Sequence, residues 1–178
     1  MESDIIYKNE SFELCEDFID VGYMAENFEA QDEYNHSVEV RRSHSDHSMT
    51  VLVSFPNYID FKEEILAMDA FLSHLQVAVH CYLIFDSRIP EATVLDNRLK
   101  KFQLLFDTEK EFGAMYGTQI VSGSLEDRLT KSLFLVSKDG AIFYLDMPHD
   151  LAKPLDLERL QVELNKAYIT YTGVGCHG

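Results

Sequence analysis

The stretch TVLVSFPNYIDFKEEILAMDAFLSHLQVAVHCYLIF at positions 50–85 decides the fold. It opens with an apolar run at 50–55, which predicts a core strand. After Pro56, apolar residues recur at three- and four-residue steps, which predicts one face of a helix. The residues on that face are Phe61, Ile65, Met68, Leu72 and Leu75. The run at 77–85 is apolar on both faces, as in a central strand covered on two sides. Strand, helix and strand in this order predict a parallel crossover.

The start of this helix carries a capping pattern. Asp60 and Glu63 have the spacing of a capping box, so Asp60 is predicted to cap the helix. A carboxylate in the first helical turn also interacts favourably with the positive end of the helix dipole.

Further elements follow on both sides of this unit. Strands are predicted at 5–7, 12–15, 18–21, 36–40, 102–106, 132–137 and 141–147, and helices at 91–101, 109–116 and 156–168. The last two strands are joined by Lys138-Asp-Gly140, a strong hairpin-turn signal. The order is that of an α/β thioredoxin-like fold with a central mixed sheet flanked by helices. We expect one domain over 1–178, with an N-terminal hairpin extension at 5–40 and a flexible tail at 169–178.

Composition and charge restrict the partners. The 178 residues, 46% hydrophobic and 26% charged, are typical of one soluble domain. The formal net charge is −16, which repels phosphate backbones and anionic lipids, so neither nucleic acid nor a membrane is an expected partner. The N-terminus lacks a basic stretch followed by an apolar run, and no segment approaches the roughly 20 apolar residues of a membrane helix. A cytoplasmic location is therefore expected.

The three cysteines, Cys15, Cys81 and Cys176, show no CxxC or other metal-ligand spacing. Such an odd number predicts neither a disulfide framework nor a zinc site. Cys81 lies in an apolar run, where a small buried residue is expected. Cys15 and Cys176 lie in more polar surroundings near the two ends, so these thiols are the candidates for a redox role.

The polar stretch RRSHSDHS at 41–48 is predicted to be a loop within the domain. Its histidines His44 and His47, with His36 nearby and a Cys-His pair at 176–177, could supply metal ligands. Solvated side chains are the favoured interpretation, because the ligands would come from three separated segments. No nucleophile-elbow motif supports a Ser-His-Asp triad, and no Gly-rich phosphate loop is present. Neither a metal nor a cofactor is expected.

Short motifs follow one another along nearly the whole chain. They are IIYK at 5–8, VG at 21–22, AENF at 25–28, VL at 51–52, FP at 55–56, FGAMYG at 112–117, SGSL at 122–125 and SKDG at 137–140. In this order and spacing, from Ile5 to Ala167, the chain resembles the bacterial thiol peroxidases, the atypical two-cysteine branch of the peroxiredoxins. The resemblance implies a thioredoxin-like fold, cell redox homeostasis as the family's role, and pairing of two chains near the active-site loop.

The active-site loop of that family reads P-x-x-D-T-x-x-C. The resemblance implies that the cysteine thiolate attacks peroxide, the threonine hydroxyl holds thiolate and peroxide, the proline shields the site, and a later arginine stabilises the negative charge. Here the loop reads PNYIDFKEE at 56–64. Aligned on Asp60, with one extra residue after Pro56, the threonine position is Phe61 and the cysteine position is Glu64. Lys131 takes the arginine position and loses the planar two-donor fork.

The resolving cysteine of the family is also missing, since no cysteine lies at 82–175, and none lies at 16–80. A carboxylate is a poor nucleophile toward peroxide and cannot pass through a sulfenic acid. Glu64 is either a new general base or, with Glu63, a first-turn acid that stabilises the helix by about 0.3–1 kcal/mol, and the second interpretation is favoured. Phe61 is expected to fill the former pocket as core packing.

Two functions follow as hypotheses. The favoured one is a pseudoenzyme, a thiol peroxidase-like protein that keeps the fold as a binding or interaction module for an unidentified protein or small molecule. The alternative is an active thiol-dependent oxidoreductase that uses a relocated cysteine, Cys15 or Cys176. A homodimer is expected from the resemblance, and the 21 Phe and Tyr residues, numerous for a small core, favour an aromatic interface.

Overall fold

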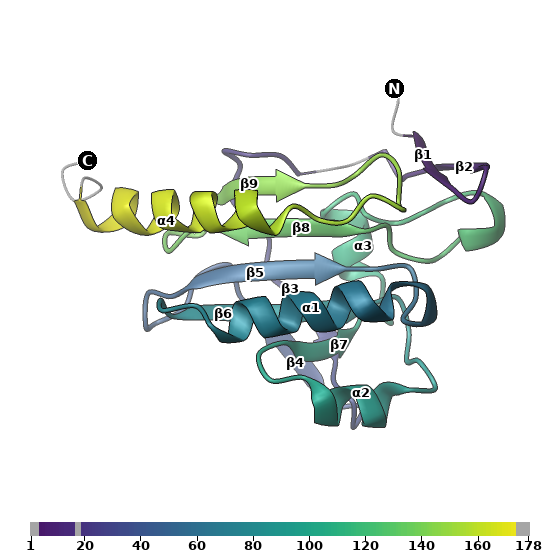
Figure 1. The fold of residues 1–178 in the computed structure, drawn as a ribbon, viewed down its shortest axis with the longest axis horizontal. Coiled ribbons are helices and arrows are strands. Elements are labelled where there is room, and N and C mark those ends of the chain that lie inside the picture. Colours follow the sequence, from purple (N-terminus) through teal and green to yellow (C-terminus); the bar gives the residue numbers. More distant parts are fainter. Residues whose placement is uncertain (1–3, 17–18, 174–178) are drawn as a thin grey trace.

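The computed structural model describes residues 4–16 and 19–173. A seven-stranded mixed sheet has the order β4-β3-β7-β6-β5-β8-β9 (Figure 1). Its strands are β3 (Phe28–Gln31), β4 (Ser37–Val40), β5 (Met49–Ser54), β6 (Val79–Phe85), β7 (Gln103–Phe106), β8 (Ser132–Val136) and β9 (Ile142–Asp146). A separate antiparallel hairpin consists of β1 (Asp4–Tyr7) and β2 (Glu10–Glu13).

The predicted parallel crossover is confirmed. Strands β5 and β6 pair in parallel from Met49 opposite Val79 to Ser54 opposite Ile84, and helix α1 (Lys62–Ser73) connects them. The late hairpin is confirmed as well, because β8 pairs antiparallel with both β5 and β9. Gly140 lies in the hairpin turn at φ +93°, a conformation that a glycine adopts without strain.

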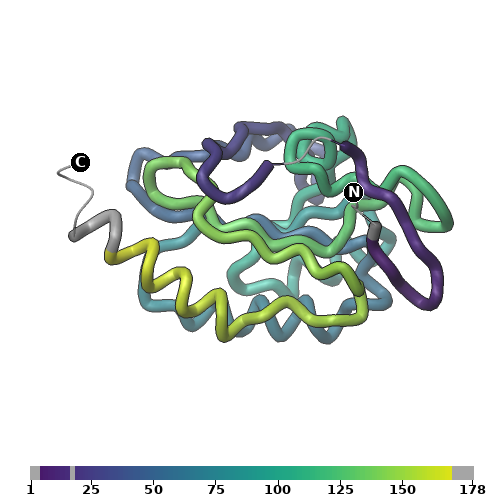
Figure 2. Tube along the Cα trace, turned by 90° about the horizontal axis from the view of Figure 1, so that it is seen from above, coloured from purple at the N-terminus to yellow at the C-terminus, as the bar shows by residue number. Residues whose placement is uncertain are grey.

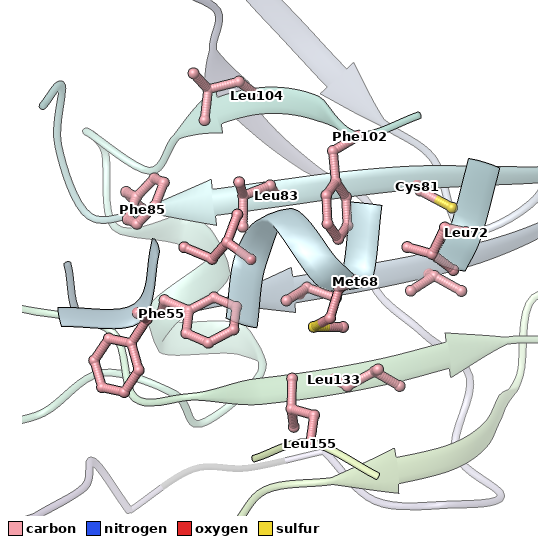
Figure 3. Close-up of a cluster of buried hydrophobic side chains, with 14 of the residues drawn as sticks. Phe55, Met68, Leu72, Cys81, Leu83, Phe85, Phe102, Leu104, Leu133 and Leu155 are labelled. Carbon is pink, nitrogen blue, oxygen red and sulfur yellow. The ribbon is translucent and has the colours of Figure 1, made fainter. Parts of the chain in front are cut away.

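Helices cover both faces of the sheet. Helices α1, α2 (Ala92–Arg98) and α4 (Leu157–Gly173) contribute buried side chains to one apolar core, and α3 (Glu111–Met115) contributes Phe112 to a second core on the opposite face. Figure 2 shows α4 and α3 on opposite sides of the sheet. Figure 3 shows the first core, in which Leu72 of α1 lies beside Cys81 of β6, and Met68 belongs to the same cluster as Leu83 and Phe85 of β6.

The predicted cap of α1 is wrong. Asp60 lies one position before the end of a 3-10 turn, Ile59–Phe61, and the residue that precedes α1 is Phe61, which makes no side-chain capping bond. Before this turn, Asn57 Oδ1 accepts the N–H of Asp60 at 2.8 Å. The N-cap is therefore Phe61, one residue later than predicted, and this shift was not visible in the capping-box spacing.

The N-terminal region contains two hairpins rather than one. Besides β1–β2, strands β3 and β4 form a second antiparallel hairpin, which joins the main sheet through β7. No strand forms at 19–21, because the chain turns there: the N–H of Tyr23 reaches the carbonyl of Asp20 at 3.1 Å. Phe18 lies outside the described residues.

The C-terminal helix is longer than predicted. Helix α4 continues to Gly173, so 169–173, expected as tail, are helical, and 174–178 lie outside the described residues. Across the part of the chain that the structure describes, no helix is both long and apolar enough to cross a membrane.

Candidate functional site

The loop between β5 and α1 is fixed at both of its ends. Pro56 is buried at its start, and the Pro56 carbonyl accepts a hydrogen bond from Arg128 Nη1 at 2.9 Å. At the far end, Asp60 Oδ2 lies 3.4 Å from Lys8 Nζ in the β1–β2 turn. The loop therefore lies between the N-terminal hairpin and the segment that precedes β8.

Strand pairing places Lys131 beside this loop. Ser54, the last residue of β5, lies opposite Ser132, the first residue of β8. Ser54 Oγ lies 2.6 Å from Ser132 Oγ and donates to the Thr130 carbonyl at 2.7 Å. These contacts hold Lys131, between Thr130 and Ser132, next to the point where the chain leaves β5 for α1.

Glu64 and Lys131 form a closed hydrogen-bond network. Lys131 Nζ donates to Glu64 Oε1 at 2.7 Å and to the Lys153 carbonyl at 2.8 Å. The second oxygen, Glu64 Oε2, accepts the N–H of Leu155 at 2.8 Å. The network thus ties the first turn of α1 to the segment before β8 and to the loop between β9 and α4.

Burial of Lys131 and Glu64 costs desolvation free energy. The side chain of Lys131 is 1% exposed and that of Glu64 is 18% exposed. Burial lowers the pKa of the Lys131 ammonium below its ordinary value, and the hydrogen bond and negative charge of Glu64 act in the opposite direction. The carboxylate is therefore the group that keeps a buried ammonium charged.

Phe61 lies in an aromatic cluster beside the pair. Its ring centroid is 5.5 Å from that of Tyr7 and 5.4 Å from that of Phe55, and the residue is buried. Lys131 Nζ lies 4.9 Å from the centroid of Phe61, within the range of a cation–π contact. Phe61 contributes apolar packing and no hydrogen-bonding group at this position.

A pocket of about 550 Å³ opens in front of the network. It is lined by Tyr7, Ile59, Asp60, Phe61, Lys62, Glu63, Glu64, Lys131 and Ala152. Burial raises the pKa of the Tyr7 hydroxyl, and the charge of Asp60 and a hydrogen bond to it act in the same direction. The neutral Tyr7 hydroxyl and the carboxylates at the rim can bind a polar ligand, while the inner wall is the closed Glu64–Lys131 network.

The structure brings three of the four positions matched to the family's active site together in one pocket. Phe61, Glu64 and Lys131 line one pocket, and Pro56 anchors the loop beside them. Tyr7 was missed because the sequence carries no signal that the first hairpin packs against the loop. Arg128 was missed for a similar reason, since only the fold brings it to the Pro56 carbonyl.

Neither described thiol lines this pocket. Cys81 is buried within β6 (Figure 3), which confirms its expected role as a small core residue. Burial raises the pKa of its thiol to about 12. Cys15 is half-buried after β2, and its Sγ lies 3.5 Å from the Gly113 carbonyl. Cys176 lies outside the described residues. A thiolate of Cys81 is thus strongly disfavoured, and Cys15 is the more accessible of the two.

Metal ligation by the described residues finds no support. No group of three or more His, Cys, Asp or Glu side chains within 4–16 and 19–173 is arranged to hold a metal ion. His36 pairs with Asp32 at 3.5 Å in the β3–β4 turn, and His44 lies in the separate loop before β5. The Cys-His pair at 176–177 lies outside the described residues.

Comparison with solved structures decides the fold family. The chain superimposes on a peroxiredoxin-like protein from Aquifex aeolicus with a TM-score of 0.84, over 94% of this chain and 98% of that one. The chain has a peroxiredoxin-like thioredoxin fold. Sequence identity to that peroxiredoxin-like protein is 13%, so the likeness concerns the fold.

Further peroxiredoxin structures agree. A thiol peroxidase from Chromobacterium violaceum gives a TM-score of 0.81 at 15% identity, covering 93% of this chain and 97% of that one. The mitochondrial 2-cys peroxiredoxin from Plasmodium falciparum gives 0.67 at 16% identity, covering 86% and 96%. No family model and no curated protein matches the sequence. The peroxiredoxin-like fold expected from the sequence motifs is thereby confirmed.

Proposed function

We propose that this chain is a peroxiredoxin-fold protein without peroxidase activity at the family's usual position, and that it serves as a binding or interaction module. One observation carries the proposal: Glu64, at the position matched to the attacking cysteine, is held by Lys131 and by the N–H of Leu155. Both oxygens of this carboxylate thus accept hydrogen bonds from within the protein.

Chemistry at the three matched positions supports the same conclusion. A carboxylate cannot form the sulfenic acid through which a thiol reduces peroxide. Phe61 offers no hydroxyl to hold the peroxide oxygen. The Lys131 ammonium already donates hydrogen bonds to Glu64 and to the Lys153 carbonyl, at 2.7 and 2.8 Å. General-base action by Glu64 is disfavoured for the same reason, because both of its oxygens already accept hydrogen bonds.

The pocket in front of the network is the proposed binding site. Its rim combines the Tyr7 hydroxyl, the acids Asp60 and Glu63, and the side chain of Ile59, which is 67% exposed. An exposed large apolar side chain beside polar groups suits a protein segment or a small polar molecule as ligand. We place this function in the cytoplasm, in keeping with the acidic charge.

A peroxide-consumption assay on the pure protein, with mass spectrometry of each cysteine, tests the proposal. We expect consumption no faster than that of an ordinary thiol and slow, unselective oxidation of Cys15 and Cys176. Rapid sulfenic acid formation at one thiol would contradict the proposal and establish the alternative, an oxidoreductase with a relocated cysteine. Cys15→Ser and Cys176→Ser variants would then identify the thiol, and Cys81→Ser is not expected to matter.

A homodimer remains part of the proposal, on the strength of the resemblance. The aromatic argument for it now rests on exposed tyrosines, Tyr23, Tyr34 and Tyr168, because no phenylalanine among the described residues is exposed. Ile59, beside the pocket, is the better support, since a dimer through the active-site loop would cover it. Sedimentation of the wild type and of Ile59→Glu distinguishes the outcomes: a dimer that Ile59→Glu dissociates supports the proposal, and a monomeric wild type at micromolar concentration overturns it.

A further inference from the structure

A second hollow, of about 350 Å³, lies at the other end of the parallel strands. It is lined by Arg41, Ser43, His44, Ser45, Asp46 and His80. The loop at 41–48 enters β5 at its N-terminal end, whereas the candidate site follows the C-terminal end of β5. The hollow is therefore separate from the proposed binding pocket.

Two imidazoles stack in this hollow. The ring centroids of His44 and His80 are 3.8 Å apart with an interplanar angle of 24°. His44 Nε2 lies 2.8 Å from Thr50 Oγ1, and Thr50 is the strand partner of His80. The stack thus joins the 41–48 loop to both central strands, one ring coming from the loop and the other from β6.

Asp46 completes the arrangement. Its Oδ2 lies 3.3 Å from His80 Nε2, and its Oδ1 accepts the N–H of Ser48 at 3.0 Å. Arg41 lines the same hollow, and its guanidinium lies 3.2 Å from Glu39 of β4. The charged groups around the stack are therefore one carboxylate beside His80 and one guanidinium already paired with an acid.

We propose that the His44–His80 stack is a pH-sensitive latch on the 41–48 loop. The stack holds the loop closed against the strands when at most one imidazole is protonated, and it releases the loop when both are. The charge of Asp46 stabilises one imidazolium, on His80. A second imidazolium on His44 would face a like charge at a ring separation of 3.8 Å, and the group that contacts its Nε2 is the neutral hydroxyl of Thr50. Repulsion at this distance favours loop conformations in which the two rings separate.

The direction of the pH dependence follows from linkage. Burial and the charge of His80 lower the pKa of His44 below the ordinary imidazole value, and Asp46 opposes this effect. Because the closed loop binds a proton less readily than the open loop, the latch is fully closed above the ordinary imidazole pKa and weakens as pH falls below it.

Titration of the imidazole signals by NMR, with amide exchange of the loop, tests the latch in the full chain. We expect the His44 imidazole to titrate below the ordinary imidazole pKa. The amides of His47 and Ser48, which bond to the His44 carbonyl and to Asp46, report opening. Their protection factors, corrected for intrinsic rates, should fall roughly tenfold over the step in which His44 protonates.

Two variants separate the latch from general acid destabilisation. His80→Gln removes one ring, and it should raise the pKa of His44 and abolish the drop in loop protection over that step. The control His36→Gln removes an imidazole that also lies beside a carboxylate, Asp32, and it should change neither quantity. A His44 titration at the ordinary imidazole pKa in the wild type, or an unchanged protection drop in His80→Gln, would overturn the proposal.

Discussion

At the scale of single residues, the site depends on one partly buried ion pair. Removing Lys131 and Glu64 from water costs free energy, and their contact at 2.7 Å offsets it only because the Lys153 carbonyl and the Leu155 N–H satisfy the remaining groups. Such a pair contributes little net stability compared with apolar packing. Loss of one partner, however, leaves the charge of the other buried without compensation for its desolvation cost.

Glu64→Gln is expected to lower the free energy of unfolding by about 3 kcal/mol, because it leaves the Lys131 ammonium buried without a counterion. Lys131→Met should cost less, since Glu64 is closer to solvent and keeps its bond to Leu155. The double variant should cost clearly less than the sum of the two single changes. Urea denaturation measures all three, with Glu63→Gln, an exposed acid in the same helical turn, as the matched control. Additive effects would show that the two side chains are not coupled.

Destabilisation by Glu64→Gln should depend on pH. Burial already lowers the pKa of Lys131 from the ordinary value of 10.5, and removal of the carboxylate lowers this pKa further. A lysine whose folded pKa lies below its unfolded pKa gains stability as pH rises between the two values. The penalty of the variant is therefore largest near neutral pH and shrinks toward about pH 10. Denaturation curves of wild type and variant at both pH values test this, and an equal penalty at both would mean that Lys131 is not the responsible group.

At the scale of secondary structure, the spacing of apolar residues predicted the elements whose burial can be read from the local sequence. The crossover of β5, α1 and β6 was found because its strands are apolar on both faces and its helix is apolar on one. The start of α1 was not found, because Asn57 adds a 3-10 turn that holds Asp60 away from the cap position. Strand β3 was missed since only four residues, FEAQ, form it, and its pairing with β4 and β7 is not encoded locally.

Asp69 is a buried charged residue of α1 that the apolar pattern of this helix did not predict. It lies on the inward side of α1 and is buried, and its carboxylate accepts the N–H groups of Lys100, Lys101 and Phe102 at 2.8 to 2.9 Å. This one side chain fixes the connection between α2 and β7.

Asp69→Ala should therefore lower the free energy of unfolding by about 2–4 kcal/mol, because it leaves three backbone donors without their acceptor. Amide exchange should accelerate locally at 100–102 in the same variant. Glu63→Gln, on the exposed side of the same helix, is the control. A loss of stability equal to that of the control would show that water replaces the carboxylate at no cost.

At the scale of the whole molecule, the fold keeps two potential sites apart. The pocket around Glu64 lies beyond the C-terminal end of β5. The imidazole stack lies at the N-terminal end of β5, at the opposite end of the central strands. The resemblance located Pro56, Phe61, Glu64 and Lys131 from the sequence. Their closed network could not be predicted, since it depends on backbone groups of Lys153 and Leu155, roughly 90 residues beyond Glu64.

Restoring the family's chemistry at Glu64, Phe61 and Lys131 tests whether the proposed pocket has lost its organisation for peroxide. Glu64→Cys alone should react with hydrogen peroxide little faster than an ordinary exposed thiol, because Phe61 and Lys131 still lack the hydroxyl and the two-donor fork. The triple change Glu64→Cys, Phe61→Thr and Lys131→Arg should react markedly faster. Stopped-flow measurement of the second-order rate of thiol oxidation, in a background with the natural cysteines replaced by serine, compares the two variants. Fast oxidation in Glu64→Cys alone would contradict the account, because the pocket would then still hold and activate a peroxide with Phe61 and Lys131 in place.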